Sequence, residues 1–400
     1  MNSAAGATTG PALAARPRSY GSIVWGQLRK RRAAMVSLAV VLALALAAIV
    51  APLIVGDVPI RWVEAGCASW PLFHYLSNAE YSAMAAFILG VTLPLTSRLL
   101  RPWADRRGKS AMVRALGLGF ALWAAVTAAL FLVRTPEQRY GFFLERRAQA
   151  ESAWFPLIAT SRNPGYEELA HRNQAPSWQH PLGTDRLGAD VVLRILYGAR
   201  TAMTIGFVAV GIGSAIGITL GSMSGYFGRR IDLVLMRLAE IFMFIPTLIL
   251  IIIILTVMPS SLPPLWAVVG VIGVTGWTGS YRLMRAELLR IRGEDYLIAA
   301  RALGIPTWRL LLRHAIPNGL APILVGATFG IAGAIFLEVT VAFLGIVNTP
   351  SWGELLNDGR QNPAAFWVWG AAGTAIFVTV FVYNVLGEAI RDAIDPRLKI

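Results

Sequence analysis

Long apolar segments separated by short polar ones dominate the sequence. The first runs from about residue 34 to 55. Each is long enough to cross the roughly 30 Å hydrocarbon layer of a membrane as a helix. Two weaker segments, about 81–99 and 111–133, add a helical hairpin. The pattern therefore predicts an all-α polytopic membrane protein with about eight transmembrane helices. The five strong segments after the hairpin occupy about 201–226, 233–258, 265–284, 320–347 and 366–389.

The composition agrees with a membrane protein and argues against other classes. Hydrophobic residues make up 56% of the 400 and charged residues 14%, with a mean hydropathy of +0.58, whereas a soluble domain carries more charge. The net charge is +14, but the basic residues gather at the ends of apolar segments, which does not favour nucleic-acid binding. The single cysteine, Cys67, and four histidines without ligand spacing predict no metal site and no cofactor.

Basic residues set the predicted orientation in the membrane. A cluster at Arg29-Lys30-Arg31-Arg32 precedes the first apolar segment, and further arginines lie in alternate loops. Because cytoplasmic loops are enriched in Lys and Arg, both termini are predicted to be cytoplasmic. Residues 1–33 then form a cytoplasmic tail, 34–55 the first transmembrane helix, and 134–198 a segment on the outer side.

One polar, arginine-rich stretch, residues 295–318, has no evident role in membrane solvation or packing. It predicts a helix over residues 296–303, a turn at Gly304 and a second helix over 307–315 that Pro317 stops. Such a bent pair suits docking of another protein, although an amphipathic helix lying in the membrane interface is the alternative. Helical spacing groups the exposed side chains as follows: Trp308, Leu311 and Leu312 on one side, Arg309 and Arg313 on another, with Ala299 and Ala300 leaving room for close approach.

This stretch resembles the cytoplasmic coupling loop of ATP-binding-cassette (ABC) importer permeases. The matching positions are Ile298-Ala299-Ala300, Gly304 and the segment from His314 to Pro317. Ile298 stands where the family often has Glu, so no ionic contact is expected from that position. The resemblance implies that an ATPase subunit docks on the loop. The candidate coupling residues are Ala299, Ala300, Gly304, Trp308, His314 and Pro317.

Four further segments resemble the C-type permeases for dipeptides, oligopeptides or nickel. The resemblance implies a type I ABC-importer core with five transmembrane helices over residues 180–400. Residues 56–179, with the hairpin at about 81–133, form an insertion. Two positions depart from the family's pattern. Ala189 stands where the family usually has Arg, and Glu388 stands where it usually has Asp, another acidic residue. The matching segments are 180–200, 236–246, 336–356 and 383–399.

Two local features of this half are also predicted. Leu187, Val191 and Ile195 are spaced four residues apart, which predicts an interfacial helix ahead of the first core span. Pro246 lies inside the apolar segment 233–258 and predicts a kink there.

The resemblance implies a permease subunit that does not hydrolyse ATP itself, in the bacterial plasma (inner) membrane. Its implied partners are two ATP-binding subunits, a second permease subunit, an extracytoplasmic solute-binding protein and membrane lipid. The alternative is an ion-coupled secondary transporter, which usually needs acidic or polar groups at mid-membrane. Glu338 is the main candidate for such a group, and it either lines a pore or locks helix packing.

Overall fold

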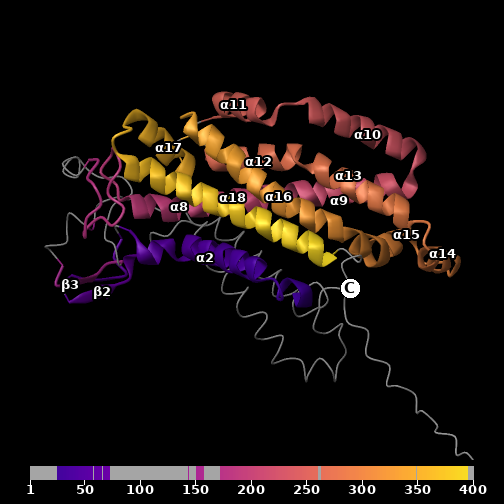
Figure 1. Cartoon of the computed structure of the whole chain (residues 1–400), viewed down its shortest axis with the longest axis horizontal. Helices are drawn as coiled ribbons and strands as arrows, with labels where there is room; N and C mark the ends of the chain where they lie inside the picture. Colours follow the sequence, from indigo (N-terminus) through magenta and orange to yellow (C-terminus); the bar gives the residue numbers. More distant parts are fainter. Residues whose placement is uncertain are drawn as a thin grey trace, which may run out of the picture.

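The structure is a computed structural model that describes residues 25–56, 58–64, 66–72, 143, 150–156, 172–259, 263–347 and 349–394. Its long helices lie side by side in an elongated bundle (Figure 1). Most of the predicted cytoplasmic tail and the hairpin predicted at about 81–133 lie outside the described residues.

Four helical segments in the described part of the chain are long and apolar enough to cross a membrane. The first, α2 (Arg32–Ile54), matches the predicted helix at 34–55. In the second, a π-turn, η3 (Ile205–Ala209), joins α8 (Val191–Thr204) to α9 (Val210–Phe227) in one run of 37 residues.

The other two long helices complete the core. α16 (Ile316–Phe343) continues a helical segment that begins at Thr307, and α18 (Phe366–Ile394) lies beside it. α2 packs against both α8 and α18. The largest apolar cluster lies where these helices meet, and it contains the fully buried Ile335 and Ala372.

The predicted span at 233–258 is sharply broken. α10 (Arg229–Phe244) and α11 (Thr247–Val257) meet at Pro246 with a bend of 74°. Proline donates no backbone hydrogen bond and disfavours the helical conformation in the residue before it, and Ile245 accordingly has φ −81° and ψ 114°. The kink predicted at Pro246 is confirmed. Neither helix is long enough to span a membrane alone, but the two together could form one broken span.

The predicted span at 265–284 is built from two helices. α12 (Pro264–Thr275) and α13 (Trp277–Ile291) meet at Gly276, whose N–H donates to the Ile272 carbonyl at 2.8 Å. α13 carries the chain beyond the predicted end of the span. The described residues therefore hold four candidate spans, or five if α10 and α11 form one, and the predicted total of eight is not confirmed.

A small antiparallel sheet adds β structure to the predicted all-α fold. β1 (Arg61–Glu64) lies between β2 (Cys67–Ser69) and β3 (Ser152–Trp154). Val63 is paired with residues of both neighbouring strands. Strands of three or four residues are too short to show a periodic signal in the sequence, which is why they were not predicted.

A short helix closes one end of the bundle, at the left of Figure 1. α17 (Trp352–Gln361) is capped by the Ser351 hydroxyl and packs tightly on α8. A β-carbon placed on Gly198 would collide with the ring of Trp352, and the indole N–H of Trp352 donates to the Ile195 carbonyl at 2.9 Å. This end is called the α17 end below, and the opposite end, which carries α14 and α15, is called the loop end.

The predicted interfacial helix through Leu187 is wrong at its start. α8 begins at Val191, because the Asp190 side chain accepts from the Val192 N–H at 2.7 Å and caps the helix there. Leu187 lies in the preceding loop and is exposed. A capping aspartate satisfies the free N–H groups of the first turn, so it fixes the helix start despite the apolar spacing.

Candidate functional site

The polar stretch between α13 and α16 folds as a bent helical pair at the loop end. α14 (Asp295–Ala302) is its first arm, and Gly304 follows with φ +75°. The Ile305 N–H donates to the Ala300 carbonyl and the Gly304 N–H to the Arg301 carbonyl. This is the Schellman arrangement that glycine favours after a helix. The turn predicted at Gly304 is confirmed, and it needs a residue that tolerates the left-handed region.

The second arm differs from the prediction at its far end. α15 (Thr307–Leu310) passes into a π-turn, η4 (Leu311–Ala315), and then directly into α16. Pro317 does not stop this arm. It lies in the first turn of α16, and the Ile316 N–H reaches the Leu311 carbonyl across the π-turn. A π-turn shifts the hydrogen-bond register, which accommodates a proline within a continuous helix. A displacement of the second arm would therefore act directly on α16.

The inner face of the bent pair is anchored in an apolar cluster. Leu297 of α14 and Leu310 of α15 are fully buried. They pack with Met284, Leu288 and Ile291 of α13. Burial of one such side chain contributes about 1.5–3 kcal/mol. The bent pair is therefore held firmly on the end of α13.

The outer face of the bent pair carries exposed apolar side chains. Leu303 is 82% exposed and Trp308 is 60% exposed, and Ile298 and Leu312 are exposed as well. Arg309 lies over the Trp308 ring, with 5.2 Å from its guanidinium carbon to the ring centre. Exposed apolar groups bordered by charge are typical of protein docking sites. These four apolar residues are called the loop surface below.

The predicted coupling residues lie on both faces of the pair. Ala300 packs against the inner cluster, whereas Ala299 is exposed. Leu311, predicted beside Trp308, also packs inward. The coupling role of the six residues stays a prediction. Ala299, Gly304, Trp308 and Pro317 are exposed, and Ala300 and His314 are half-buried.

α13 and α9 touch along a stripe of glycines spaced four residues apart, from Gly213 to Gly225. A β-carbon on Gly217 would lie 2.6 Å from the Trp277 carbonyl oxygen, and one on Gly225 would lie 2.6 Å from that of Arg285. Both distances are shorter than van der Waals contact. Small residues let membrane helices approach this closely. The backbones of α13 and α9 are therefore in direct contact along this stripe.

A charged pair ties α10 to the same helices. Arg285 of α13 donates to both carboxylate oxygens of Asp232, at 2.5 and 2.6 Å. Ser224 of α9 donates to Asp232 as well and lies 2.9 Å from the Tyr281 hydroxyl. A bidentate pair fixes orientation as well as distance. α9, α10, α13 and the bent pair therefore form one tightly connected unit at the loop end.

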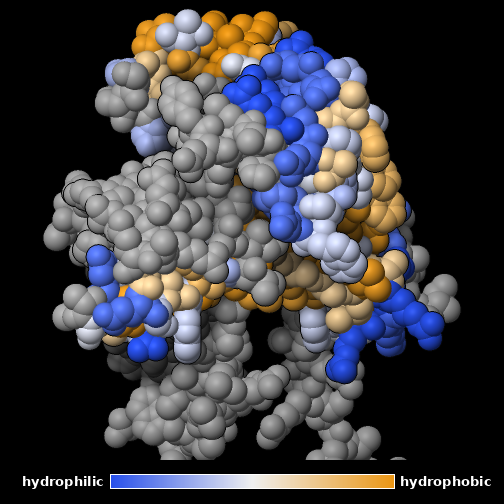
Figure 2. Space-filling model, turned by 90° about the vertical axis from the view of Figure 1, so that its left-hand side faces the viewer, coloured by the Kyte–Doolittle hydropathy of each residue, from blue (hydrophilic) through white to orange (hydrophobic). Residues whose placement is uncertain are grey.

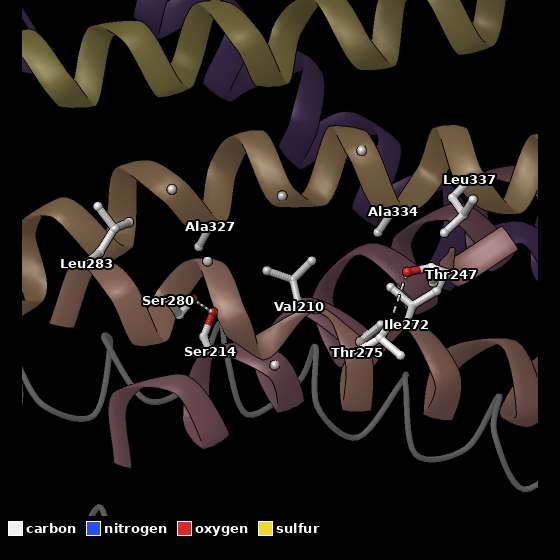
Figure 3. A pocket seen from close by; sticks show the side chains of 17 residues that line it. Val210, Ser214, Thr247, Ile272, Thr275, Ser280, Leu283, Ala327, Ala334 and Leu337 are labelled. Atoms are coloured by element: carbon white, nitrogen blue, oxygen red, sulfur yellow. Dashed lines mark hydrogen bonds between the residues drawn. The ribbon is translucent and has the colours of Figure 1, made fainter. Parts of the chain in front are cut away.

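A cavity of about 320 Å³ lies between α9, α12, α13 and α16 (Figure 3). Every residue that lines it is uncharged. Its polar groups are hydroxyls: Ser214 lies 3.4 Å from Ser280, and Thr247 lies 3.4 Å from Thr275. Glycines and alanines make up much of the remaining wall. The cavity can accommodate a small solute, but it offers no charged group to hold one tightly.

Glu338 is not among the residues that line this cavity. It is only 4% exposed, on α16, and its hydrogen-bonding neighbour is Ser351 at the start of α17. Its second carboxylate oxygen, Oε1, has no hydrogen-bond partner among the described residues. This position favours helix packing over pore lining.

Sequence reasoning missed a buried charge cluster at the α17 end. Arg194 of α8, which is 7% exposed, lies 3.2 Å from each of three carboxylates, those of Asp185, Glu354 and Asp358. Burial raises the pKa of the Asp185 and Glu354 carboxyls, while the charge of Arg194 opposes that rise. Arg186 adds a second cation, 2.7 Å from Asp358. The i, i+4 spacing of Glu354 and Asp358 was the available signal, but it did not reveal a partner so distant in sequence.

This group of residues, called the Arg194 cluster below, is held together by ion pairs within the chain. In the described part of the chain, no set of three or more His, Cys, Asp or Glu side chains is arranged to hold a metal ion. Its ion pairs join α8 to α17 and to the loop before α8.

Two family models match this sequence. One is described as "Binding-protein-dependent transport system inner membrane component" and matches residues 217–400. The other is described as "N-terminal TM domain of oligopeptide transport permease C" and matches residues 19–60. The first range contains the bent pair, α16, α17 and α18, and the second contains α2. Residues 61–216 lie outside both.

Several curated proteins are similar over much of the chain. The dipeptide transport system permease protein of Haemophilus influenzae is 36% identical over 295 residues, which is 68% of this chain and 99% of that protein. Its counterpart in Alkalihalophilus pseudofirmus is 36% identical over 62% of this chain and 82% of that protein. The oligopeptide transport system permease protein of Bacillus subtilis is 36% identical over 58% of this chain and 76% of that protein. One chain of a solved structure, an inward-facing methionine ABC transporter, aligns over 50% of this chain and 96% of its own length, with 17% sequence identity and a TM-score of 0.43.

Proposed function

The chain belongs to the C-type permease family of dipeptide and oligopeptide ABC transport systems, and we propose that it moves a peptide or a similarly small solute across the membrane while partner subunits hydrolyse ATP. The bent pair is the observation that carries this proposal. It presents the loop surface outward, is anchored on α13 and runs without a break into α16. A force applied there would reach two membrane helices at once.

The proposed mechanism is alternating access. An ATPase that binds the loop surface more tightly in one conformation shifts the permease toward that conformation. The unit of α9, α10, α13 and the bent pair moves as a body, because the glycine stripe and the pair of Asp232 with Arg285 leave little room for sliding. The chain itself performs conformational work and supplies no catalytic group.

The cavity is the proposed wall of the solute path. It lies between α13 and α16, the two helices that the bent pair connects. A displacement of the pair would therefore change its shape. An uncharged lining of hydroxyl groups and glycines suits a transport path, because the path must bind the solute weakly enough to release it again.

The proposed partners are a second permease chain, two ATP-binding chains and an extracytoplasmic solute-binding protein. Figure 2 looks onto the α17 end and shows strongly hydrophobic surface at the top, where Figure 1 places α11. α10 and α11 each bury only one residue, Ala239 and Ile251. This hydrophobic surface is available to lipid and to a second permease chain.

The proposed orientation puts the loop end and both termini in the cytoplasm of a bacterial cell, and the α17 end outside. It follows from the distribution of basic residues and from the cytoplasmic supply of ATP. Single cysteines in a Cys67→Ser background test it with a reagent that does not cross the membrane. A cysteine at Ser152, which is exposed in β3, is expected to react from outside, and one at Ser110 is not. The reverse pattern would contradict the orientation.

Reconstitution separates this function from that of an ion-coupled carrier. The chain, its second permease, the ATPase chains and the solute-binding protein are placed in proteoliposomes, and uptake of labelled di- and oligopeptides is measured. Uptake is expected to require ATP on the loop side and to survive ionophores. Uptake by the chain alone, driven by an ion gradient and independent of ATP, would support the secondary transporter instead.

A further inference from the structure

A hydrogen-bonded turn segment, called the finger below, lies at the α17 end. It spans residues 174–184, which lie in the magenta trace just before α8 in Figure 1. The Thr184 N–H donates to the Gln174 carbonyl at 3.0 Å, and nearer the tip the Ser177 N–H donates to the His180 carbonyl at 2.9 Å. Trp178 lies in the turn at the tip and is fully exposed, at 103%. Tryptophan is enriched at protein interfaces, because it combines a large apolar surface with a polar N–H group, so an exposed tryptophan in a hydrogen-bonded turn is a candidate contact residue.

The base of the finger is fixed to two membrane helices. His180 lies 3.0 Å from Asp190, the residue that caps α8. The indole N–H of Trp367 in α18 donates to the Thr184 carbonyl at 3.2 Å. Gly183 has φ +71°, and a β-carbon there would collide with this indole ring. The tip is therefore presented in a defined position, which lowers the entropic cost of binding.

The position of the Arg194 cluster argues that the finger points into water. The cluster lies at the first turn of α8 and includes Asp185 at the base of the finger. Charged groups of this number do not belong in the hydrocarbon layer. Because the base of the finger adjoins this cluster, a membrane-anchoring role for Trp178 is not favoured.

Exposed apolar and basic residues flank the tip in the sequence. Leu182 and Leu187 are both exposed. Both acidic residues of the loop before α8, Asp185 and Asp190, are fully buried, whereas Arg172 and Arg186 are exposed, and Arg186 is already paired with Asp358 at 2.7 Å. A matching partner would offer an apolar pocket with an acidic rim, and tryptophan is the residue type that most often dominates such contacts.

We propose that Trp178 is a docking anchor for the extracytoplasmic solute-binding protein. The inference rests on the proposed function, which places the α17 end outside, and on the family description, which names binding-protein-dependent transport. The soluble partner binds the tip in an apolar pocket, and an acidic group beside that pocket faces Arg172. The finger then holds the partner over the α17 end while solute is released.

The test uses the assembled transporter in lipid nanodiscs and the purified solute-binding protein that stimulates ATP hydrolysis by the wild-type assembly. Trp178→Ala is expected to raise the Kd for that protein at least about tenfold. Trp178→Phe is expected to restore part of the affinity. The control is Trp70→Ala, because Trp70 is also exposed, at 53%, but follows β2, and its Kd is expected to match wild type. Basal ATP hydrolysis and thermal stability are expected to stay unchanged in all three variants.

Three results would overturn the inference. The first is a Kd for Trp178→Ala within about twofold of wild type. The second concerns lipid: a fluorophore on Gln179→Cys in a Cys67→Ser background that is quenched by nitroxide-labelled lipids would place the tip in the membrane. The third is a wild-type assembly that no solute-binding protein binds or stimulates, which would contradict the proposed function itself and the inference with it.

Discussion

Gly225 of α9 lies so close to Leu288 of α13 that a β-carbon on the glycine would be 2.7 Å from the Leu288 β-carbon. Leu288 is fully buried in the same apolar cluster as Leu297 and Leu310 of the bent pair. One side chain therefore connects the glycine stripe inside the bundle with the inner face of the bent pair at its end. The bent pair, which carries the loop surface, is therefore packed together with the two membrane helices α9 and α13.

The glycine stripe is expected to be intolerant of even one methyl group. In Gly221→Ala the new β-carbon would start 2.6 Å from the Tyr281 carbonyl oxygen, and such overpacking costs about 1–3 kcal/mol. The detergent-solubilised protein should therefore unfold at a lower temperature, as measured by size-exclusion chromatography after heating. Gly211→Ala on the same helix meets nothing within 4 Å and should match wild type. Equal midpoints for the two variants would contradict the close approach of α9 and α13.

The long apolar helices could be predicted because a membrane span needs only length and composition. α2 begins within two residues of its predicted start, and α18 begins at the predicted residue. The sharp break at Pro246 and the joint at Gly276 could not be predicted with their geometry, because the same apolar sequence is compatible with a straight helix. The sheet of β1 to β3 was missed because its strands are too short to show alternation.

The candidate site was predictable where a local rule decides the structure. Gly304 supplies a turn that its sequence context already demands. Pro317 was predicted to stop a helix, and it fails to do so because the π-turn η4 absorbs it. The Arg194 cluster depends on a contact between α8 and α17, and such long-range pairs leave no mark in one sequence.

The Arg194 cluster predicts a pH-dependent stability defect. Arg194→Met leaves buried carboxylates without their cation, which costs about 3–5 kcal/mol. Burial already raises the pKa of Asp185 and Glu354, and loss of Arg194 raises it further. A carboxyl whose pKa is higher in the folded state than in the unfolded state binds more protons when folded, so lower pH favours folding.

The stability deficit of Arg194→Met relative to wild type should therefore be largest near neutral pH and should shrink as the pH falls toward the ordinary carboxyl pKa of about 4. Thermal unfolding of both proteins, measured from neutral pH down to about pH 4, gives this deficit. Arg194→Lys, which keeps the positive charge, should show a smaller deficit. A deficit for Arg194→Met that does not change with pH would contradict this electrostatic explanation.

The cavity predicts a transport defect without a folding defect. β-Carbons on Gly279 and Gly333 meet nothing within 4 Å, so Gly279→Leu and Gly333→Leu should fold normally and fill the cavity. Peptide uptake at matched protein levels should fall by about tenfold or more, since a blocked path cannot be bypassed. Gly211→Leu, which also meets open space but lies outside the cavity, should transport normally. Normal uptake by the two cavity variants would remove the cavity from the solute path.

The loop surface predicts where the ATPase binds. Trp308→Ala removes a side chain that is 60% exposed, so the permease should still insert and fold. Binding of the purified ATPase chain should weaken by about tenfold, because an exposed tryptophan anchor often contributes this much. Trp266→Ala on α12, where the tryptophan is 44% exposed, serves as the matched control. An equal loss in both variants would mean that the effect is not specific to the loop surface.

The central claim is that the geometry of the turn at Gly304 transmits ATP hydrolysis to the membrane helices. A β-carbon at Gly304 meets nothing within 4 Å, so only its φ of +75° restricts the residue. Asparagine tolerates this conformation, and the β-branched valine does not. The decisive measurement is solute-stimulated ATP hydrolysis by the complete transporter that carries Gly304→Val or Gly304→Asn. The account predicts that Asn retains stimulation and that Val loses most of it, with both proteins inserted and assembled. Equal stimulation in the two variants would contradict it.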